Sequence, residues 1–292
     1  MIVVLGCGFL GQYIIKELNQ QPKEKIIATY RNNRNAQFYS GKLTWIPFDI
    51  TKETDLANLK TMCRNEPINV FYLAGCHNID YVYHNRDQAR QVNVLALDRF
   101  LNKFGNIQSL FFASSDCVYG ENTDRIKRFK ETDETNPINI YGAQKKEAEQ
   151  LVLSKGYSVV RLPYMLGPSL SKKRHFYDSI VRSLADAKPL QLIDGLRRSV
   201  LSYQQVAAIL VRLLIEHQHP AILNIAGDTS YTKYEMGLHI ANALGYSSQS
   251  IIKQSTAFMA ELFVDARANT TVMDNQLLKK VLGVSTLEWE CH

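Results

Sequence analysis

Short apolar runs alternate with longer amphipathic stretches through the first half of the chain. Five of the runs predict β-strands, at Ile2–Leu5, Lys25–Tyr30, Leu43–Pro47, Asn69–Ala74 and Ser109–Ser114. Between them, apolar residues recur at helical spacing in Leu10–Asn19, Leu56–Asn65 and Arg86–Phe104. The strands are rich in Val, Ile and Phe and lack polar alternation. That pattern is typical of a sheet covered on both faces, and therefore of parallel βαβ units.

The alternation continues for one more unit and then weakens. A helix is predicted at Tyr141–Ser154 and a strand at Ser158–Leu162. The later elements are predicted helices at Phe176–Asp186, Gln204–His217 and Lys233–Leu244 and a strand at Ile222–Ala226. We therefore expect an α/β fold with a Rossmann-type, doubly wound parallel sheet over residues 1–165. A smaller, substrate-binding lobe is expected over residues 166–292, with residues 204–226 as candidates to pack back on the first domain.

A glycine-rich loop follows the first predicted strand. The sequence Gly6-Cys7-Gly8-Phe9-Leu10-Gly11 has the spacing G-x-G-x-x-G, joins a strand to a helix and lies within a βαβ unit of about thirty residues. Glycines at these places permit a tight turn and a close approach of the backbone to a pyrophosphate at the helix N-terminus. The loop therefore predicts a dinucleotide site that includes Gly6, Gly8, Phe9, Leu10 and Gly11.

The end of the second strand bears on the choice of cofactor. An acidic residue at this place would bind a ribose 2′-hydroxyl, but the sequence has Arg31 and, three residues later, Arg34. An arginine suits a 2′-phosphate, so we expect NADP(H) to be preferred, with NAD(H) as the alternative. Asp49 and Ile50, after the third strand, are candidates to lie beside the adenine.

Candidate catalytic residues lie at the fifth strand and the helix after it. Tyr141 and Lys145 are four residues apart, which places both side chains on one helical face. A tyrosine titrates near pH 10, and a neighbouring ammonium lowers that pKa, so the pair predicts a proton relay for a carbonyl or an alcohol. Ser114 and Ser115 end the fifth strand, where a hydroxyl can hydrogen-bond the reacting oxygen.

Charge and cysteine usage exclude several classes of protein. The net charge of +6 comes from basic residues dispersed among acids, which does not favour nucleic acid but suits a small phosphate-bearing molecule. Five cysteines are scattered without a C-x-x-C pair, so no metal site and no disulfide framework are predicted. Since no apolar run approaches the roughly 18 residues of a membrane span, we expect a cytoplasmic protein.

Taken together, the motifs resemble the extended short-chain dehydrogenases/reductases, the superfamily of NAD-dependent epimerases and dehydratases. Within it the chain is most similar to the dTDP-4-dehydrorhamnose reductase group. The resemblance rests on Gly6/Gly8/Gly11, Leu73-Ala74-Gly75, Val92-Asn93-Val94, Ser114–Gly120, Tyr141 with Lys145, Arg161–Tyr164 and Arg267–Asn275. Two departures are Leu5, where the family's first loop glycine stands, and Gln205, where many members carry an acid.

The resemblance implies roles for individual residues. Ser115 is implied to hydrogen-bond the reacting oxygen, and Tyr141 to act as the acid–base. Lys145 is implied to lower the pKa of Tyr141 and to bind the ribose of the cofactor. The further residues implied at the cofactor are Ala74, Gly75, Asn93 and Pro163. Arg197 and Arg198 are implied candidates for the phosphates of a sugar nucleotide, and the further residues implied at the substrate are Asp116, Cys117 and His175. A homodimer through the helices around 86–104 and 141–154 is implied as well.

The resemblance implies a reductase that passes hydride from NADPH to a keto group of a nucleotide-linked deoxysugar. Sugar-nucleotide 4,6-dehydratases carry an Asp-Glu pair where this chain has Asp116 and Cys117, so dehydration is not expected. Epimerisation, alone or with reduction, is the alternative. The GDP-4-keto-6-deoxymannose epimerase–reductase has a matching Cys and a His in the second lobe, near which His175 falls. A non-catalytic NADP-binding regulatory protein is a second alternative.

Overall fold

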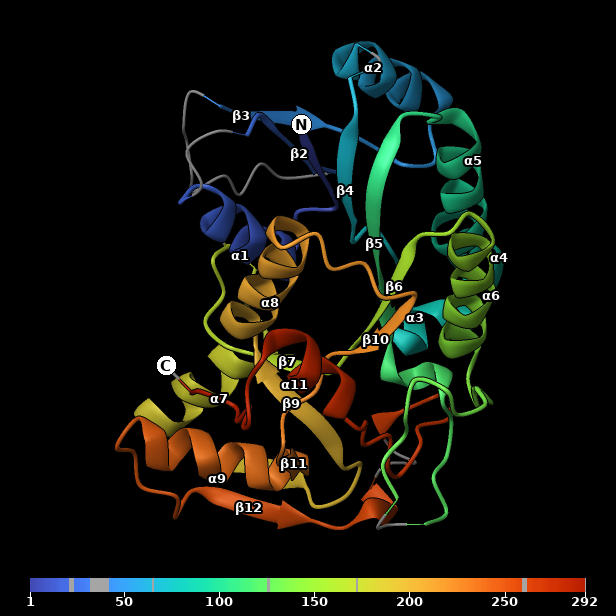
Figure 1. Cartoon of the computed structure of the whole chain (residues 1–292). Helices are drawn as coiled ribbons and strands as arrows, with labels where there is room; N and C mark the ends of the chain where they lie inside the picture. Colours follow the sequence, from blue (N-terminus) through green and yellow to red (C-terminus); the bar gives the residue numbers. More distant parts are fainter. Residues whose placement is uncertain are drawn as a thin grey trace.

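A seven-stranded parallel sheet forms the centre of the computed structural model, which describes residues 1–20, 24–31, 42–64, 66–124, 127–171, 173–258 and 262–291 (Figure 1). In sheet order the strands are β10 (Ile222–Asn224), β6 (Ser158–Leu162), β5 (Ile107–Ser115), β4 (Ile68–Tyr72), β1 (Ile2–Leu5), β2 (Ile26–Tyr30) and β3 (Leu43–Pro47). Every neighbouring pair is parallel. The order reverses between β1 and β4, and ligands of such sheets bind outside the carboxyl ends at this point. The predicted doubly wound sheet is confirmed.

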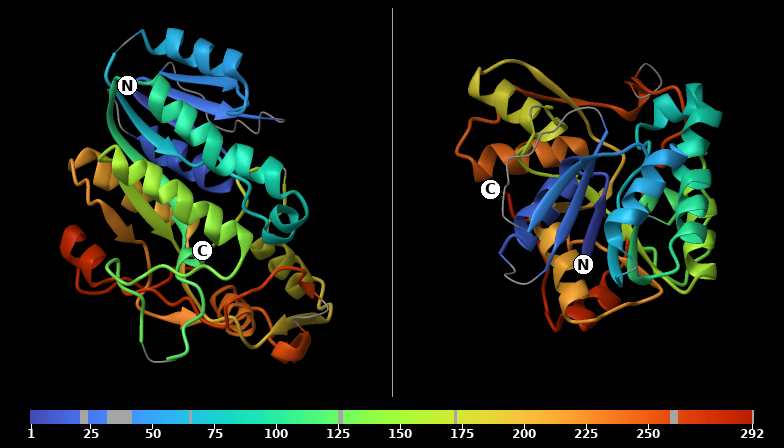
Figure 2. Two further views of the ribbon diagram at one scale, coloured as in Figure 1. Left: turned by 90° about the vertical axis from the view of Figure 1, so that its right-hand side faces the viewer. Right: turned by 90° about the horizontal axis from the view of Figure 1, so that it is seen from above.

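Helices cover both faces of this sheet (Figures 1 and 2). One layer holds α1 (Phe9–Leu18), α8 (Tyr203–Ile215) and α11 (Gln276–Leu282), and the other holds α2 (Glu53–Cys63), α5 (Ala96–Lys103) and α6 (Ile140–Ser154). In β1, Ile2 and Val4 belong to the first core while Val3 and Leu5 belong to the second. Both faces of the strand are buried, which is why its sequence lacks polar alternation.

Two late elements complete the central sheet and its covering. β10 forms one edge of the sheet and pairs with β6, placing Ile222 opposite Val159. α8 packs against α1 and begins in a capping box, in which the Ser202 hydroxyl and the Gln205 side chain each bind the other's backbone. α8 and β10 therefore pack on elements formed by the first 165 residues.

The predicted helix over 86–104 is interrupted. α4 (Arg86–Arg90) and α5 are joined by a π-helical turn over Gln91–Leu95. A further helix, α3 (Ile79–His84), precedes them and begins at Asn78, whose side chain accepts a hydrogen bond from the Tyr81 amide. Neither feature was predicted, because a six-residue helix and one extra residue in a helical turn barely change the apolar spacing.

The remaining elements form the smaller lobe, at the bottom of Figure 1. It contains a three-stranded sheet of β7 (Tyr164–Leu166), β9 (Arg198–Ser202) and β11 (Ser230–Tyr231), a pair β8 (Leu190–Ile193) with β12 (Ile251–Gln254), and helices α7 (Phe176–Ala185) and α9 (Lys233–Ala243). These strands were not predicted, since two to five residues are too few for a periodic signal. Among the described residues, no helix is long and apolar enough to cross a membrane.

Candidate active site

The glycine-rich loop packs its backbone against the end of β4. Gly6 has a φ of +91°, and a Cβ there would come within 2.7 Å of the Ala74 amide nitrogen. The Gly6 amide donates a hydrogen bond to Thr29 Oγ1 at 2.9 Å, which ties the loop to β2 as well. Gly6 therefore fixes the loop at the carboxyl ends of three neighbouring strands.

Gly8 stands in a different environment from the other loop glycines. A Cβ on Gly8 would meet no atom within 4 Å, whereas one on Gly11 would lie 3.0 Å from the Gly6 carbonyl oxygen. Leu10 is buried in the core beneath the loop, and Phe9 is partly buried. Gly6 and Gly11 thus serve the packing of the chain, and Gly8 leaves open space at the start of α1.

Arg31 follows β2 and faces the end of β3. It is exposed, and its charge contributes to lowering the pKa of Asp49. Partial burial raises that pKa, but hydrogen bonds from Thr51 to Asp49 Oδ1, at 2.7 and 3.0 Å, outweigh it. Ile50 beside it is buried. Arg34 and the predicted helix end at Asn65 lie outside the described residues.

The two serines at the end of β5 point to opposite sides. Ser114 is buried and donates its hydroxyl to Glu149. Ser115 donates to Asp116 Oδ1 at 3.0 Å, accepts from the Cys117 amide at 3.2 Å, and hydrogen-bonds the side chain of Tyr141. Because the Ser114 hydroxyl is taken up by Glu149, Ser115 is the serine placed to act with Tyr141.

Tyr141 is held beside Ser115 by the start of α6. Asn139 caps the helix by accepting a hydrogen bond from the Gly142 amide at 2.8 Å. A Cβ on Gly142 would lie 2.5 Å from the Cys117 carbonyl oxygen, so glycine allows the helix to approach the β5 end this closely. Burial raises the pKa of the Tyr141 phenol well above its usual value, and the hydrogen bond with Ser115 opposes this only in part. Its hydroxyl is therefore protonated at neutral pH.

Lys145 lies one helical turn beyond Tyr141. Its ammonium is buried, donates to the Ala113 carbonyl oxygen at 2.7 Å and lies 5.9 Å from the centre of the Tyr141 ring. Burial lowers the pKa of Lys145 to about 8, although Glu149 and Cys76 raise it. A Cβ on Gly75 would lie 3.5 Å from the Lys145 Nζ.

Asn93 projects from the π-helical turn into the same region. Its amide accepts from the Cys76 backbone nitrogen at 2.7 Å and donates to the Cys76 carbonyl oxygen at 3.1 Å. A second bond, of 2.9 Å, runs from Asn93 Nδ2 to Gln144 Oε1 on α6. Asn93 thus fixes the backbone after β4 next to Lys145. Pro163, between β6 and β7, is buried.

The residues expected to bind substrate are arranged in two groups. Asp116 accepts from Thr271 and forms an ion pair with Arg198, with 3.5 Å between Oδ2 and Nε. Arg198 is therefore linked to Ser115 through Asp116, which contacts both side chains. Arg197 points elsewhere, since it pairs with Glu235 at 2.6 Å and donates to the Ser230 carbonyl oxygen at 2.7 Å.

Cys117 and His175 occupy separate surroundings, and no contact between them occurs in the described part of the chain. Burial, with a contribution from Asp116, raises the pKa of the Cys117 thiol to about 12. His175 precedes α7, and its ring lies 4.7 Å from that of Phe9. Burial lowers the pKa of His175 to about 4.

Two residues that the sequence analysis did not name, Lys233 and Phe263, stand near Arg198 together with Arg267. The Lys233 ammonium lies over two aromatic rings, 5.2 Å from the Phe176 centre and 5.3 Å from that of Phe263. Arg267 covers Phe263 at 4.7 Å and pairs with Asp80 at 3.0 Å. Burial lowers the pKa of Lys233, and Arg198 and Arg267 lower it further, so cations gather here. No spacing could reveal this cluster, because its members come from four distant segments.

The chain matches a family model described as the RmlD substrate binding domain over residues 1–292. A relative, methionine adenosyltransferase 2 subunit beta of Xenopus tropicalis, is 24% identical over 263 residues, which cover 86% of this chain and 73% of that protein.

Two solved structures illustrate the similarity of the fold. A dTDP-4-dehydrorhamnose reductase of Bacillus anthracis in complex with NADP has a TM-score of 0.79 at 18% identity, covering 99% of this chain and 95% of that one. A UDP-glucuronic acid 4-epimerase of Bacillus cereus, in complex with UDP-glucuronic acid and NAD, has a TM-score of 0.80 at 17% identity, covering 98% and 94%.

Proposed function

Because the chain belongs to the RmlD substrate binding domain family, we propose that it is an NADP(H)-dependent reductase of a keto group on a nucleotide-activated deoxysugar. The observation that carries the proposal is the placement of Tyr141. Its protonated hydroxyl bonds Ser115 at the carboxyl edge of the sheet, with the Lys145 ammonium one turn away. This edge is also where the glycine-rich loop lies.

The residues at the switch point fit a dinucleotide. Gly8 leaves room at the N-terminus of α1 for a pyrophosphate, and Lys145 and Asn93 stand where a ribose and its neighbouring ring would lie. Arg31 is free of any ion pair among the described residues and is suited to a 2′-phosphate. When bound, NADPH supplies the hydride that reduces the keto carbon.

The chain's own residues supply the proton. As hydride reaches the keto carbon, negative charge grows on its oxygen, and the Tyr141 hydroxyl is the acid that protonates it. Ser115 can turn its hydroxyl from Asp116 toward that oxygen and stabilise the same charge. The raised pKa of the Tyr141 phenol favours reduction of the ketone over oxidation of the alcohol, because Tyr141 then holds its proton before the reaction begins.

The cluster of Arg198, Lys233 and Arg267 suits the diphosphate of a sugar nucleotide. Three cations lie together, and among the described residues Lys233 has no carboxylate in an ion pair with it. A dianion there would relieve their mutual repulsion. Phe176 and Phe263 offer faces on which a nucleobase can stack.

The direct test is NADPH consumption on addition of 4-keto-6-deoxy sugars linked to dTDP, UDP or GDP. We expect one of them to be reduced, with turnover lost in Tyr141→Phe. Lys233→Met should raise KM for the sugar nucleotide and leave NADPH affinity unchanged. If none of the three is reduced by protein that binds NADPH, the proposal is contradicted.

A second candidate function is that of a subunit that binds cofactor and regulates another enzyme. The observation that favours it is the relative named as subunit beta of methionine adenosyltransferase 2. The set of Ser115, Tyr141 and Lys145 opposes it, since a purely regulatory protein does not need a proton relay. Binding of NADPH without turnover, together with co-purification of a methionine adenosyltransferase, would favour the subunit.

A further inference from the structure

Three successive residues at the end of β5 contact three residues spaced four apart along α6. Ser115 bonds Tyr141, Ala113 accepts from Lys145, and Ser114 donates to Glu149. Positions i, i+4 and i+8 lie on one face of a helix, so α6 presents all three to the strand end. The first two belong to the proposed proton relay. The third residue, Glu149, has no role in the proton relay of the proposed function.

Glu149 is a buried carboxylate, only 3% exposed. Arg161 on β6 binds it with two nitrogens, Nε to Oε1 at 3.1 Å and Nη2 to Oε2 at 2.8 Å. A carboxylate of this kind costs free energy to desolvate and persists only when such bonds hold it. Arg161 and Ser114 therefore hold the Glu149 carboxylate in one position.

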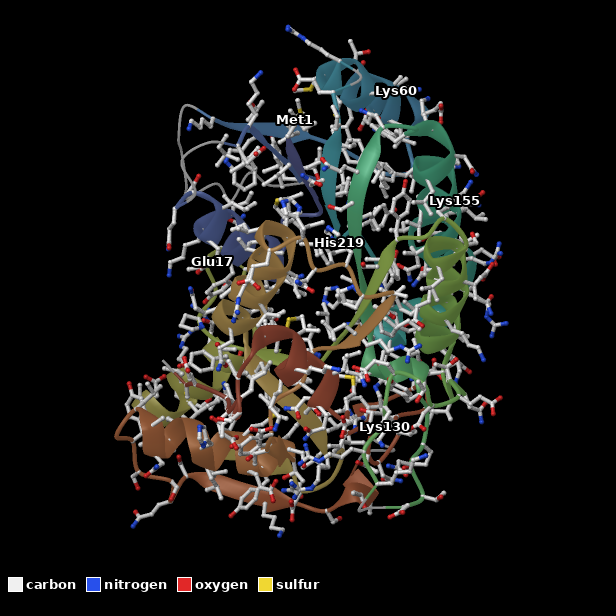
Figure 3. The ribbon with its side chains drawn as sticks, in the orientation of Figure 1. Met1, Glu17, Lys60, Lys130, Lys155 and His219 are labelled. Carbon is white, nitrogen blue, oxygen red and sulfur yellow. The ribbon has the colours of Figure 1, made fainter. Side chains whose placement is uncertain are left out.

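Arg161 is itself held by a buried group on the far side. Its Nη1 donates to the Tyr119 hydroxyl at 2.8 Å, and its guanidinium lies 4.7 Å from the centre of the Tyr119 ring. The same hydroxyl lies 2.8 Å from Asn224 Oδ1 on β10 and 3.0 Å from the carbonyl oxygen of Lys130, in the loop below α6 in Figure 3. The network thus runs from β10 to the strand end without reaching solvent.

Among the described residues, few charged or titratable groups surround Lys145. On α6 they are Tyr141 and Glu149, and from the loop after β4 they are Cys76 and His77. Tyr141 and Cys76 are neutral at pH 7, since burial raises the pKa of each. Glu149 is therefore the carboxylate that opposes the cost of burying the Lys145 ammonium.

We propose that Glu149 is a positioning residue for the proton relay: its fixed carboxylate keeps Lys145 charged and docked on the end of β5. The inference rests on the proposed function, because only a charged Lys145 favours the phenolate that Tyr141 forms when it gives up its proton. Arg161 then serves to hold Glu149 in place.

The experiment is a pH titration of the Lys145 ammonium by ¹⁵N NMR of the lysine side chains, with the Lys145→Met spectrum for assignment. In Glu149→Gln we expect the midpoint to fall by about one pH unit, the lower end of the effect of a close opposite charge. Glu147→Gln is the matched control. It removes a carboxylate of the same helix that pairs with Arg90 and lies outside this network, so the midpoint should stay unchanged.

Two results would overturn the proposal: an unchanged midpoint in Glu149→Gln, or the same fall in Glu147→Gln, which would mean that any charge lost from this helix has this effect. If Glu149→Gln does not fold, the Glu149→Gln/Arg161→Met double variant removes both charges of the buried pair together. Its midpoint should lie below that of the native protein, and one at or above it counts against Glu149. Because the titration needs no turnover, a protein inactive on every sugar nucleotide would contradict the proposed function alone.

Discussion

The imidazole of His175 is joined to the hydroxyl of Tyr203, with 3.0 Å between Nε2 and the phenolic oxygen. The bond connects the residue before α7 to the first residue of α8, beside Phe9 of the glycine-rich loop. Because the imidazole is largely removed from water, its pKa falls to about 4. His175 is therefore neutral in the folded protein at pH 7.

This pKa predicts a contribution to acid sensitivity. Between pH 4 and about 6.5 the unfolded chain binds a proton at His175 that the folded protein does not, so the free energy of unfolding falls as the pH is lowered through this window. We expect the melting temperature of the native protein to drop more steeply from pH 6.5 to 4.5 than that of His175→Gln. Parallel curves for the two proteins would show that His175 is not the group responsible.

Removal of the Tyr141 hydroxyl should separate chemistry from binding. We expect turnover of Tyr141→Phe to fall by about 10² or more, because general acid catalysis contributes at least that much. NADPH affinity, measured by fluorescence titration, should be unchanged. A Tyr141→Phe protein that keeps most of its turnover would exclude Tyr141 as the acid.

The two loop glycines should respond differently to alanine. Gly6→Ala places a Cβ 2.7 Å from the Ala74 nitrogen at a φ of +91°, and should cost about 2 kcal/mol or more of stability. Gly8→Ala meets no protein atom and should leave the melting temperature unchanged. Its NADPH affinity should fall by about tenfold or more, because the space is needed by the pyrophosphate. Unfolding curves and NADPH titrations of both variants check this, and normal NADPH affinity in Gly8→Ala would place the cofactor elsewhere.

Arg31 should decide between the two nicotinamide cofactors. We expect NADPH to bind at least several-fold more tightly than NADH, and Arg31→Ala to narrow that gap by weakening NADPH alone. Asp49 lies close enough for Arg31 to lower its pKa. Asp49→Asn is therefore the control for a change of charge beside Arg31 that does not remove the arginine itself. Equal affinities of the native protein for the two cofactors would contradict the prediction.

Reaction in D₂O should distinguish reduction from epimerisation with reduction. Cys117, with its raised pKa, and His175, with its lowered one, are poorly suited to move protons beside a ketone. We therefore expect no enzyme-dependent deuterium at the carbons next to the keto group, measured against the substrate incubated without protein. Deuterium that appears with native protein and disappears in Cys117→Ser would establish epimerisation.

The central sheet could be predicted because its strands are buried on both faces, as the split of β1 between two cores illustrates. The spacing of Tyr141 and Lys145 likewise placed both on one face of α6. Sequence alone did not distinguish Ser114 from Ser115, since both contact α6 and only the fold shows that Ser114 binds Glu149 while Ser115 lies beside Tyr141. Lys233 and Phe263 had no sequence signal, and Arg267 was named only as the start of a family segment, because folding alone brings the three together.

The pairing of β10 with β6 has a consequence for synthesis on the ribosome. When residue 165 has emerged from the ribosome, β6 still lacks its neighbour β10, and the apolar face of α1 is not yet covered by α8. A nascent chain stalled before residue 224 would therefore expose an open sheet edge and an uncovered helix, the surfaces on which chaperones act and aggregates grow. Folding of residues 1–165 thus depends on residues that are translated some sixty codons later.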